Sequence, residues 1–114
     1  MGNPVVHFEI YGKDGGALER FYGSLFEWGI AAPNANNYRE IHTGDGQIHG
    51  GIGVRPDGNG FVSFYVAVDD VQSYLTRAEK LGGKTVLPVT RVTDEYVIAM
   101  FADPEGHLIG LVRS

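Results

Sequence analysis

The residues best suited to chemistry in this chain alternate along its first apolar segment. His7, Glu9 and Tyr11 stand two positions apart, so on a β-strand their side chains point to the same face. A histidine can act as a ligand or a general base near neutral pH. A carboxylate on a closed surface needs a partner, for which Tyr11, His7 and a bound ligand are the candidates. Glu9 is therefore the candidate general base, able to take a proton from a carbon next to a carbonyl group. The alternative is an open sheet edge where these side chains face water or hydrogen-bond one another.

The composition predicts one compact soluble domain and excludes several classes of site. The chain has 114 residues, 43% of them hydrophobic, and its 9 basic and 14 acidic residues give a net charge of −5. That charge argues against binding to nucleic acid, which needs a basic face. Because the chain has no cysteine, any metal would be held by His, Asp or Glu. No apolar run is long enough to cross a membrane and the first residues lack a leader pattern, so we expect a cytoplasmic protein without membrane contact.

The first half of the chain has the pattern of a strand, a helix and three further strands. Alternation over residues 4–11 predicts a half-buried strand. Apolar residues at helical spacing predict a helix over residues 17–28, with Asp14 or a neighbour as its N-cap. The three strand-like segments that follow cover residues 28–32, 38–43 and 47–54.

The second half repeats this order. Residues 61–68 alternate as a strand, and Asp69-Asp70 begins a helix that ends at Gly82-Gly83. The remaining strands are expected over residues 84–89 or slightly beyond, 96–102 and 107–113. Adding 56 to a position gives its counterpart, so His7 corresponds to Ser63. The sequence therefore predicts a single α+β domain over residues 1–114, with a βαβββ module at 4–54, a linker at 55–60 and a second βαβββ module at 61–113.

Each module must turn the apolar face of its first strand towards its helix, which leaves the opposite face for a ligand. The opposite faces carry His7, Glu9 and Tyr11 in module one, and Ser63 and Tyr65 in module two. A curved mixed sheet with its helices outside could gather these side chains into a cup, the usual form of a ligand site. His49 lies in a glycine-rich strand where the backbone can approach a ligand, and we expect it to join them. Aromatic and apolar side chains could line the cup or fill the core; the candidates are Trp28, Tyr38, Tyr65, Tyr96 and Met100.

The doubled βαβββ order and several short motifs resemble the vicinal oxygen chelate superfamily, which includes glyoxalase I, extradiol dioxygenases and the bleomycin resistance proteins. The motifs are Val-His-Phe-Glu-Ile in the first strand, residues 21–29 at the end of the first helix, Leu81-Gly82-Gly83, and residues 103–107 before the last strand. The chain is most similar to the bacterial glyoxalase-like proteins of this group. The resemblance covers the whole chain and implies paired modules and frequently a homodimer, which we expect here.

The resemblance also implies where a metal would bind. Metal enzymes of the superfamily hold a divalent cation with one residue from the first and one from the last strand of each module, usually His and Glu. In this chain those positions fall at His7, at Ser63, near His49 or Gly50, and at Gly110. Glycine has no side chain to coordinate, so at most two positions are filled. A rearranged trio of His7, Glu9 and His49 could still bind a divalent metal such as Zn, Ni, Mn or Fe.

Three functions remain open at this point. The first is a glyoxalase-like protein that binds a small molecule in an aromatic-lined cup beside a degenerate metal site. The second is a lyase or isomerase acting on a small carbonyl compound, either metal-dependent through His7, Glu9 and His49, or metal-free with Glu9 as the base. The third is a structural or regulatory dimer whose cup is filled by its own side chains. The fold does not choose among them, because one fold hosts many chemistries.

Overall fold

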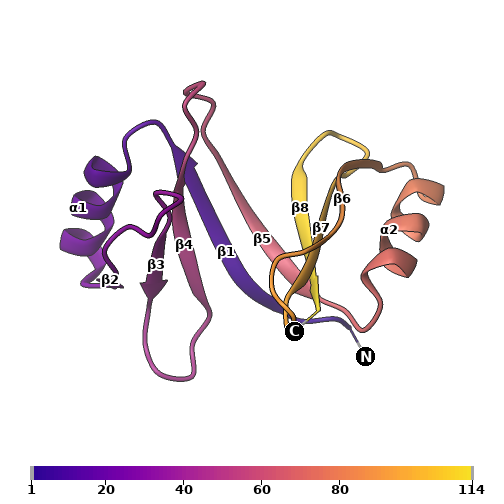
Figure 1. The fold of residues 1–114 in the computed structure, drawn as a ribbon, viewed down its shortest axis with the longest axis horizontal. Helices are drawn as coiled ribbons and strands as arrows, with labels where there is room; N and C mark the ends of the chain where they lie inside the picture. Colours follow the sequence, from indigo (N-terminus) through magenta and orange to yellow (C-terminus); the bar gives the residue numbers. More distant parts are fainter. Residues whose placement is uncertain (1, 114) are drawn as a thin grey trace. The chain divides into compact units, whose positions relative to one another are not determined.

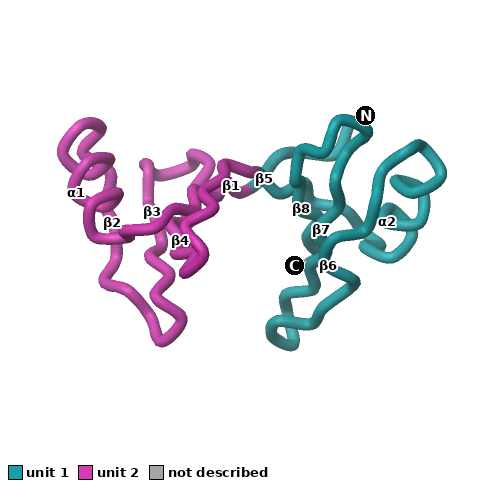
Figure 2. The backbone as a smooth tube through the Cα atoms, turned by 90° about the horizontal axis from the view of Figure 1, so that it is seen from above, with its two compact units in different colours: residues 1–6, 64–114 teal, residues 7–63 magenta. Residues whose placement is uncertain are grey.

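The computed structural model describes residues 2–113, within which eight strands and two helices form (Figure 1). The strands make a mixed sheet with parallel and antiparallel pairs. The chain divides into two compact units, distinguished by colour in Figure 2: unit 1 comprises residues 1–6 and 64–114, and unit 2 comprises residues 7–63. The predicted α+β class, with two successive runs of strand, helix and three strands, is confirmed.

In unit 2 the strand order is β2-β3-β4-β1. Strands β1 and β4 pair in parallel, whereas β2 with β3 and β3 with β4 are antiparallel. Helix α1 packs against β4 and β2. The elements are β1 (Val5–Gly12), which begins just before this unit, α1 (Gly15–Phe26), β2 (Gly29–Ile30), β3 (Arg39–His42) and β4 (His49–Val54).

Unit 1 has the corresponding order, β5-β8-β7-β6. Strands β5 and β8 are parallel, and the other two pairs are antiparallel. Helix α2 packs against β7, β6 and β8. The elements are β5 (Phe61–Ala67), whose first three residues belong to unit 2, α2 (Val71–Lys80), β6 (Lys84–Arg91), β7 (Val97–Ala102) and β8 (Leu108–Arg113).

Both helices begin at an aspartate, as the sequence indicates. The side chain of Asp14 accepts a hydrogen bond from the backbone N–H of Ala17 at 3.0 Å, and Asp70 does the same for Ser73 at 3.1 Å. Each bond satisfies a backbone donor that the first helical turn leaves without a partner. Helix α1 starts two residues earlier than expected and ends at Phe26, because Glu27 adopts a left-handed conformation with φ 57°. The following strand, expected over 28–32, is only two residues long.

Each unit has its own apolar core. In unit 2, Ile41 and Ile52 are almost fully buried, and the rings of Phe8 and Trp28 lie 5.6 Å apart beneath α1. In unit 1 one cluster joins α2 to its sheet; its buried members are Val68, Val71, Leu75, Val97, Ala99 and Leu111. Among the residues that the structure describes, no helix is long and apolar enough to cross a membrane.

The register of the parallel strands defines which residues correspond in the two units. Glu9 lies opposite Gly51, and Tyr65 lies opposite Gly110. Because Tyr65 is the counterpart of Glu9 by the offset of 56, Gly110 corresponds to Gly51. The resemblance to the vicinal oxygen chelate superfamily implies this position near His49 or Gly50, one or two residues earlier. The last strand of each unit therefore carries a glycine at the equivalent position, facing the polar side of the sheet.

Candidate functional site

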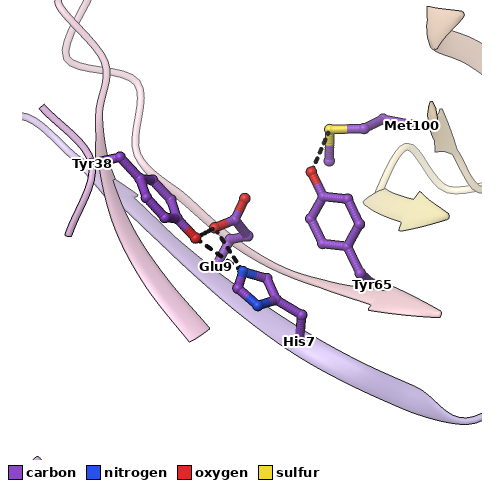
Figure 3. Close-up of polar contacts among 5 residues, drawn as sticks. All are labelled: His7, Glu9, Tyr38, Tyr65 and Met100. Carbon is purple, nitrogen blue, oxygen red and sulfur yellow. Dashed lines mark hydrogen bonds and ion pairs between the residues drawn. The ribbon is translucent and has the colours of Figure 1, made fainter. Parts of the chain in front are cut away.

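Three polar side chains of unit 2 form one hydrogen-bonded cluster, which we call the Glu9 cluster: His7, Glu9 and Tyr38 (Figure 3). The hydroxyl of Tyr38 donates to Oε2 of Glu9 at 2.6 Å. Nε2 of His7 lies 2.9 Å from that hydroxyl and 3.3 Å from the same carboxylate oxygen. The Glu9 side chain is 7% exposed and that of His7 is 33% exposed. The carboxylate is therefore buried, and the imidazole is its more accessible neighbour.

The hydrogen-bond directions in the Glu9 cluster follow from counting protons. A phenol has a single proton, and here the Tyr38 hydroxyl donates it to Glu9. The contact between His7 and the hydroxyl oxygen must then be a bond that Nε2–H of His7 donates. This assigns the proton of His7 to Nε2 and directs both donors towards the carboxylate. Hydrogen bonds to an ionised carboxylate are among the stronger ones in proteins.

A tight turn presents Tyr38 to this cluster. The side chain of Asn34 accepts hydrogen bonds from the backbone N–H groups of Asn36 and Tyr38, at 2.9 and 3.0 Å. The backbones of Asn34 and Tyr38 also bond, at 3.0 Å, and Asn37 adopts a left-handed conformation with φ 58°. Asparagine is favoured at both kinds of position. The turn therefore holds Tyr38 at the start of β3, so that its ring lies over β4.

Gly51 provides the space that Tyr38 occupies. A Cβ atom at residue 51 would collide with the hydroxyl and ring of Tyr38. The adjacent glycines follow the same rule, since a Cβ at Gly53 would meet the ring of Tyr11 and one at Gly50 would meet Phe8. The glycine-rich strand thus lets large side chains lie flat on the sheet. The sequence indicated close approach at these glycines, and the structure shows that the approaching groups include aromatic rings of the chain itself.

Tyr11 lies beside the cluster on the same strand. Its ring stacks on Phe61, with centroids 4.7 Å apart and planes 12° apart. The guanidinium of Arg55 lies 5.5 Å from the centroid of Phe61. Burial raises the pKa of the Tyr11 hydroxyl, and the negative charge of Glu9 raises it further, while Arg55 acts in the opposite direction. Tyr11 is therefore held in its neutral form next to the Glu9 carboxylate.

His49 lies opposite His7 in the register, but its side chain interacts elsewhere. The backbone N–H of Thr43 donates to its Nδ1 at 3.1 Å, and its ring stacks on His42 with centroids 4.1 Å apart. Because Nδ1 accepts, the proton of the neutral ring is on Nε2. Histidines that ligate metals usually use the opposite arrangement, in which the second nitrogen donates.

The residues present do not fit a divalent metal site. No group of three His, Asp or Glu side chains within residues 2–113 is placed to hold a metal ion. His7 and Glu9 come together as expected, but the Tyr38 hydroxyl lies between them and Gly51, and Nε2 of both His7 and His49 carries a proton. The predicted trio of His7, Glu9 and His49 stays a prediction that needs these bonds to rearrange.

The two predicted ligand-binding residues of the second module are both buried. Ser63 is 4% exposed and ends unit 2. In unit 1, Tyr65 is 8% exposed, and its ring covers Gly110 as Tyr38 covers Gly51. The Tyr65 hydroxyl lies 3.8 Å from the sulfur of Met100 (Figure 3). Ser63 and Tyr65 have further interactions within the structure.

Sequence reasoning did not assign Tyr38 to Glu9. Tyr38 was expected only as a candidate for lining a pocket, and the partners considered for Glu9 were Tyr11, His7 and a ligand. The signal that could have found it is the pair of glycines at 51 and 53, on the face that carries Glu9 and Tyr11. Two missing side chains beside a buried carboxylate leave a space that a large polar residue from the neighbouring strand can fill.

Comparisons with known proteins agree with the fold. A model of the Glyoxalase/Bleomycin resistance protein/Dioxygenase superfamily matches residues 5–111. The “Putative glyoxylase CFP32” of Mycobacterium tuberculosis (strain CDC 1551 / Oshkosh), like its namesake from Mycobacterium bovis, is 29% identical over 111 residues. The match covers 90% of this chain but 42% of the relative, so the chain spans about two fifths of the length of that protein.

Solved structures of the same fold cover nearly the whole chain. A superfamily member from Vibrio splendidus 12B01 has a TM-score of 0.72 and 18% identity, covering 99% of this chain and 100% of its own. Methylmalonyl-CoA epimerase from Mycobacterium tuberculosis has a TM-score of 0.69 and 18% identity, and the match covers 95% of this chain and 85% of the epimerase chain. The Mn(II)-bound glyoxalase from Novosphingobium aromaticivorans has a TM-score of 0.71 and 17% identity, and the match covers 96% of this chain and 38% of the glyoxalase chain. At these identities the likeness concerns the fold alone.

Proposed function

This chain belongs to the Glyoxalase/Bleomycin resistance protein/Dioxygenase superfamily, and we propose that it is a small-molecule-binding domain whose polar site is the Glu9 cluster and whose metal site is degenerate. The observation that carries this proposal is the position of Tyr38. Its hydroxyl lies in the space above Gly51 and donates to Glu9, so a protein group occupies the place beside the carboxylate. A buried carboxylate with two converging donors and an accessible imidazole can orient a small ligand.

Aromatic surface beside the cluster supports an apolar or aromatic ligand body. The Tyr38 ring covers β4, and the Tyr11–Phe61 stack continues along the same face of unit 2. Aromatic rings provide a large contact area with few rotatable bonds. A ligand with a flat apolar body and one polar group would place the polar group at the Glu9 cluster and the body on these rings.

A second candidate is a proton-transfer enzyme, and the burial of Glu9 favours it. In a lyase or isomerase acting on a small carbonyl compound, Glu9 would take a proton from the carbon next to the carbonyl, and the C–H electron pair would move towards the carbonyl oxygen as an enolate. Tyr38 and His7 would fix the position of the carboxylate. The match to an epimerase structure is compatible with this chemistry but concerns the fold.

The first experiment distinguishes a metal-free site from a metal site. Protein purified without an affinity tag or chelator is subjected to elemental analysis, and its melting temperature is compared in EDTA and in Mn²⁺, Ni²⁺ or Zn²⁺. We expect substoichiometric metal and no change in melting temperature with the chelator. Near-stoichiometric metal that is lost in the His7→Ala variant would contradict the proposal and support the trio of His7, Glu9 and His49.

A second experiment separates binding from catalysis. Exchange of the α-protons of acetophenone with D₂O is followed by NMR in the presence of the wild-type protein and of the Glu9→Gln variant. A binding protein leaves the exchange rate at the buffer value in both. Acceleration by the wild type that disappears in Glu9→Gln would establish the proton-transfer alternative, because the amide keeps the shape of the side chain and removes its basicity.

A further inference from the structure

The charge on the polar face of unit 2 points to the class of ligand that this site would accept. We infer that the ligand presents a cationic or neutral hydrogen-bond donor, such as an ammonium or amide N–H, to Glu9, and that the site discriminates against carboxylates and other oxyanions. The inference rests on the proposed binding function and names its ligand class. It concerns residues 7–63 alone.

Glu9 supplies the buried charge of this face. The Tyr38 hydroxyl donates to its Oε2 atom, and Nε2–H of His7, which donates to that hydroxyl, also lies 3.3 Å from the same carboxylate oxygen. A carboxylate can accept about four hydrogen bonds, so these two, together with the side-chain hydrogen bond from Tyr11, leave acceptor capacity for a ligand. In the formal charge count, which takes histidine as neutral, the cluster carries the single negative charge of Glu9.

The neighbouring strands add no free cation to this face. Glu40 on β3 lies opposite Gly51 and therefore shares the face of Glu9, and it is exposed. His42 and His49 stack on one another further along the same two strands. The cation of β3, Arg39, lies opposite Ile52 and so faces α1, where it bonds Glu19 at 2.8 Å.

Arg55 is a cation whose charge acts on Tyr11, and it is already paired. Its guanidinium bonds Asp57 at 3.1 Å and lies over the ring of Phe61. Across residues 7–63 there are seven acidic and four basic residues, so unit 2 carries a formal charge of −3. A ligand anion would approach a buried negative charge through a negative surface, whereas a cation or a neutral N–H donor would be attracted.

The Tyr38–Gly51 pair leaves the negative charge of Glu9 uncompensated at this site. A divalent cation beside Glu9 would make the site attract oxyanions. A phenol hydroxyl in the same space donates one proton to Glu9 and contributes no net charge. The sign of the local charge is then set by the carboxylate, and a polar hydrogen of the ligand is the complementary group.

Three probes with the same ring test the inference. Benzylamine, benzamide and benzoate place an ammonium, an amide and a carboxylate on one phenyl group. Binding to the ¹⁵N-labelled protein is followed by NMR at pH 7, using the backbone signals of His7, Glu9, Tyr38 and Gly51. We expect benzylamine to bind at least about tenfold more tightly than benzoate, with benzamide between them. Raising the salt concentration should weaken benzylamine binding and leave benzamide unchanged.

Variants assign the selectivity to Glu9. In Glu9→Gln the preference for benzylamine over benzoate should fall to about twofold or less, while Glu40→Gln, a matched loss of one exposed charge on the same face, should keep most of it. Because Glu9→Gln could fail to fold, the salt dependence of the wild type stands as an independent measurement. Benzoate binding as tightly as benzylamine at these signals would overturn the inference and leave the binding function intact. No shift at these signals with any of the three probes would overturn both.

Discussion

The hydroxyl of Tyr38 lies where a side chain at Gly51 would begin, and from there it donates a 2.6 Å hydrogen bond to Glu9. The pair links two strands of unit 2: Tyr38 directly precedes β3, and Gly51 lies within β4 opposite Glu9 on β1. The absence of a side chain at residue 51 is therefore a condition for the polar cluster. A glycine at this position is required by the ring above it and by no unusual backbone angle, since Gly51 is not among the glycines with positive φ.

Replacing Gly51 with alanine should therefore displace Tyr38. The added methyl would overlap the hydroxyl and ring, and overpacking of this kind typically costs about 1–3 kcal/mol. We expect Gly51→Ala to lower the free energy of unfolding by that amount in urea and to shift the NMR signals of Glu9 and His7. Gly23→Ala in α1 is the control, because a Cβ there meets only ordinary van der Waals contacts with Ile30 and Trp28, and alanine is the better helix former. Equal stability of Gly51→Ala and wild type would show that the ring moves without cost.

A double-mutant cycle should detect coupling between Tyr38 and Glu9. Tyr38→Phe removes the donated proton and keeps the ring, and we expect it to destabilise the protein by about 1.5–3 kcal/mol, the range for a hydrogen bond to a charged group. The same change in a Glu9→Gln background should cost markedly less, because the buried charge is gone. Urea unfolding of the four proteins at pH 7 gives the interaction energy. Additive effects would mean that the two side chains do not depend on one another.

The fold was predictable because its signals are local and repeated. Alternation along β1 and β5, helical spacing in α1 and α2, and aspartate caps at residues 14 and 70 are patterns within single segments. The segments without such patterns were predicted less well. Strand β2 covers only Gly29–Ile30, because Glu27 ends α1 in a left-handed conformation and an irregular loop connects β2 to β3.

The site was predictable only where its residues lie on one strand. His7 and Glu9 are two positions apart, so the period of a strand is enough to place them together. Tyr38 is 29 residues from Glu9, and its approach depends on the Asn34 turn and on the register that puts Gly51 opposite Glu9. For His49 the sequence pattern indicated the face of the sheet, but the face alone did not determine which residues its side chain contacts. Its ring interacts with Thr43 and His42 instead.

The turn before β8 should make stability depend on pH in acid. The carboxylate of Asp103 accepts backbone N–H groups of Glu105 and His107, both at 2.9 Å. The bond from His107 is the main cause that lowers the pKa of Asp103 below its usual value. A lowered pKa gives stability that is present above the usual value, near 3.8, and is lost as pH falls through the lowered one. Urea midpoints measured from about pH 5 down to about pH 2.5 should fall less steeply in Asp103→Asn. If the urea midpoint falls equally steeply with pH in both proteins, Asp103 does not contribute to the acid dependence of stability.

Tyr11 should produce the opposite dependence in alkali. Burial, together with the negative charge of Glu9, raises the pKa of its hydroxyl above the usual value of 10.0. A raised pKa in the folded state means that the neutral phenol is favoured there. Its contribution to stability is complete below pH 10 and is lost as pH rises through the higher folded value.

Absorbance near 295 nm should show one tyrosine of the folded protein ionising late, and this late step should disappear in Tyr11→Phe. Tyr96→Phe removes the same group from a side chain that is half exposed, and the late step should survive that change. If instead the late step persists in Tyr11→Phe, the protected phenol belongs to another tyrosine, and the place of Tyr11 beside the buried carboxylate is wrong.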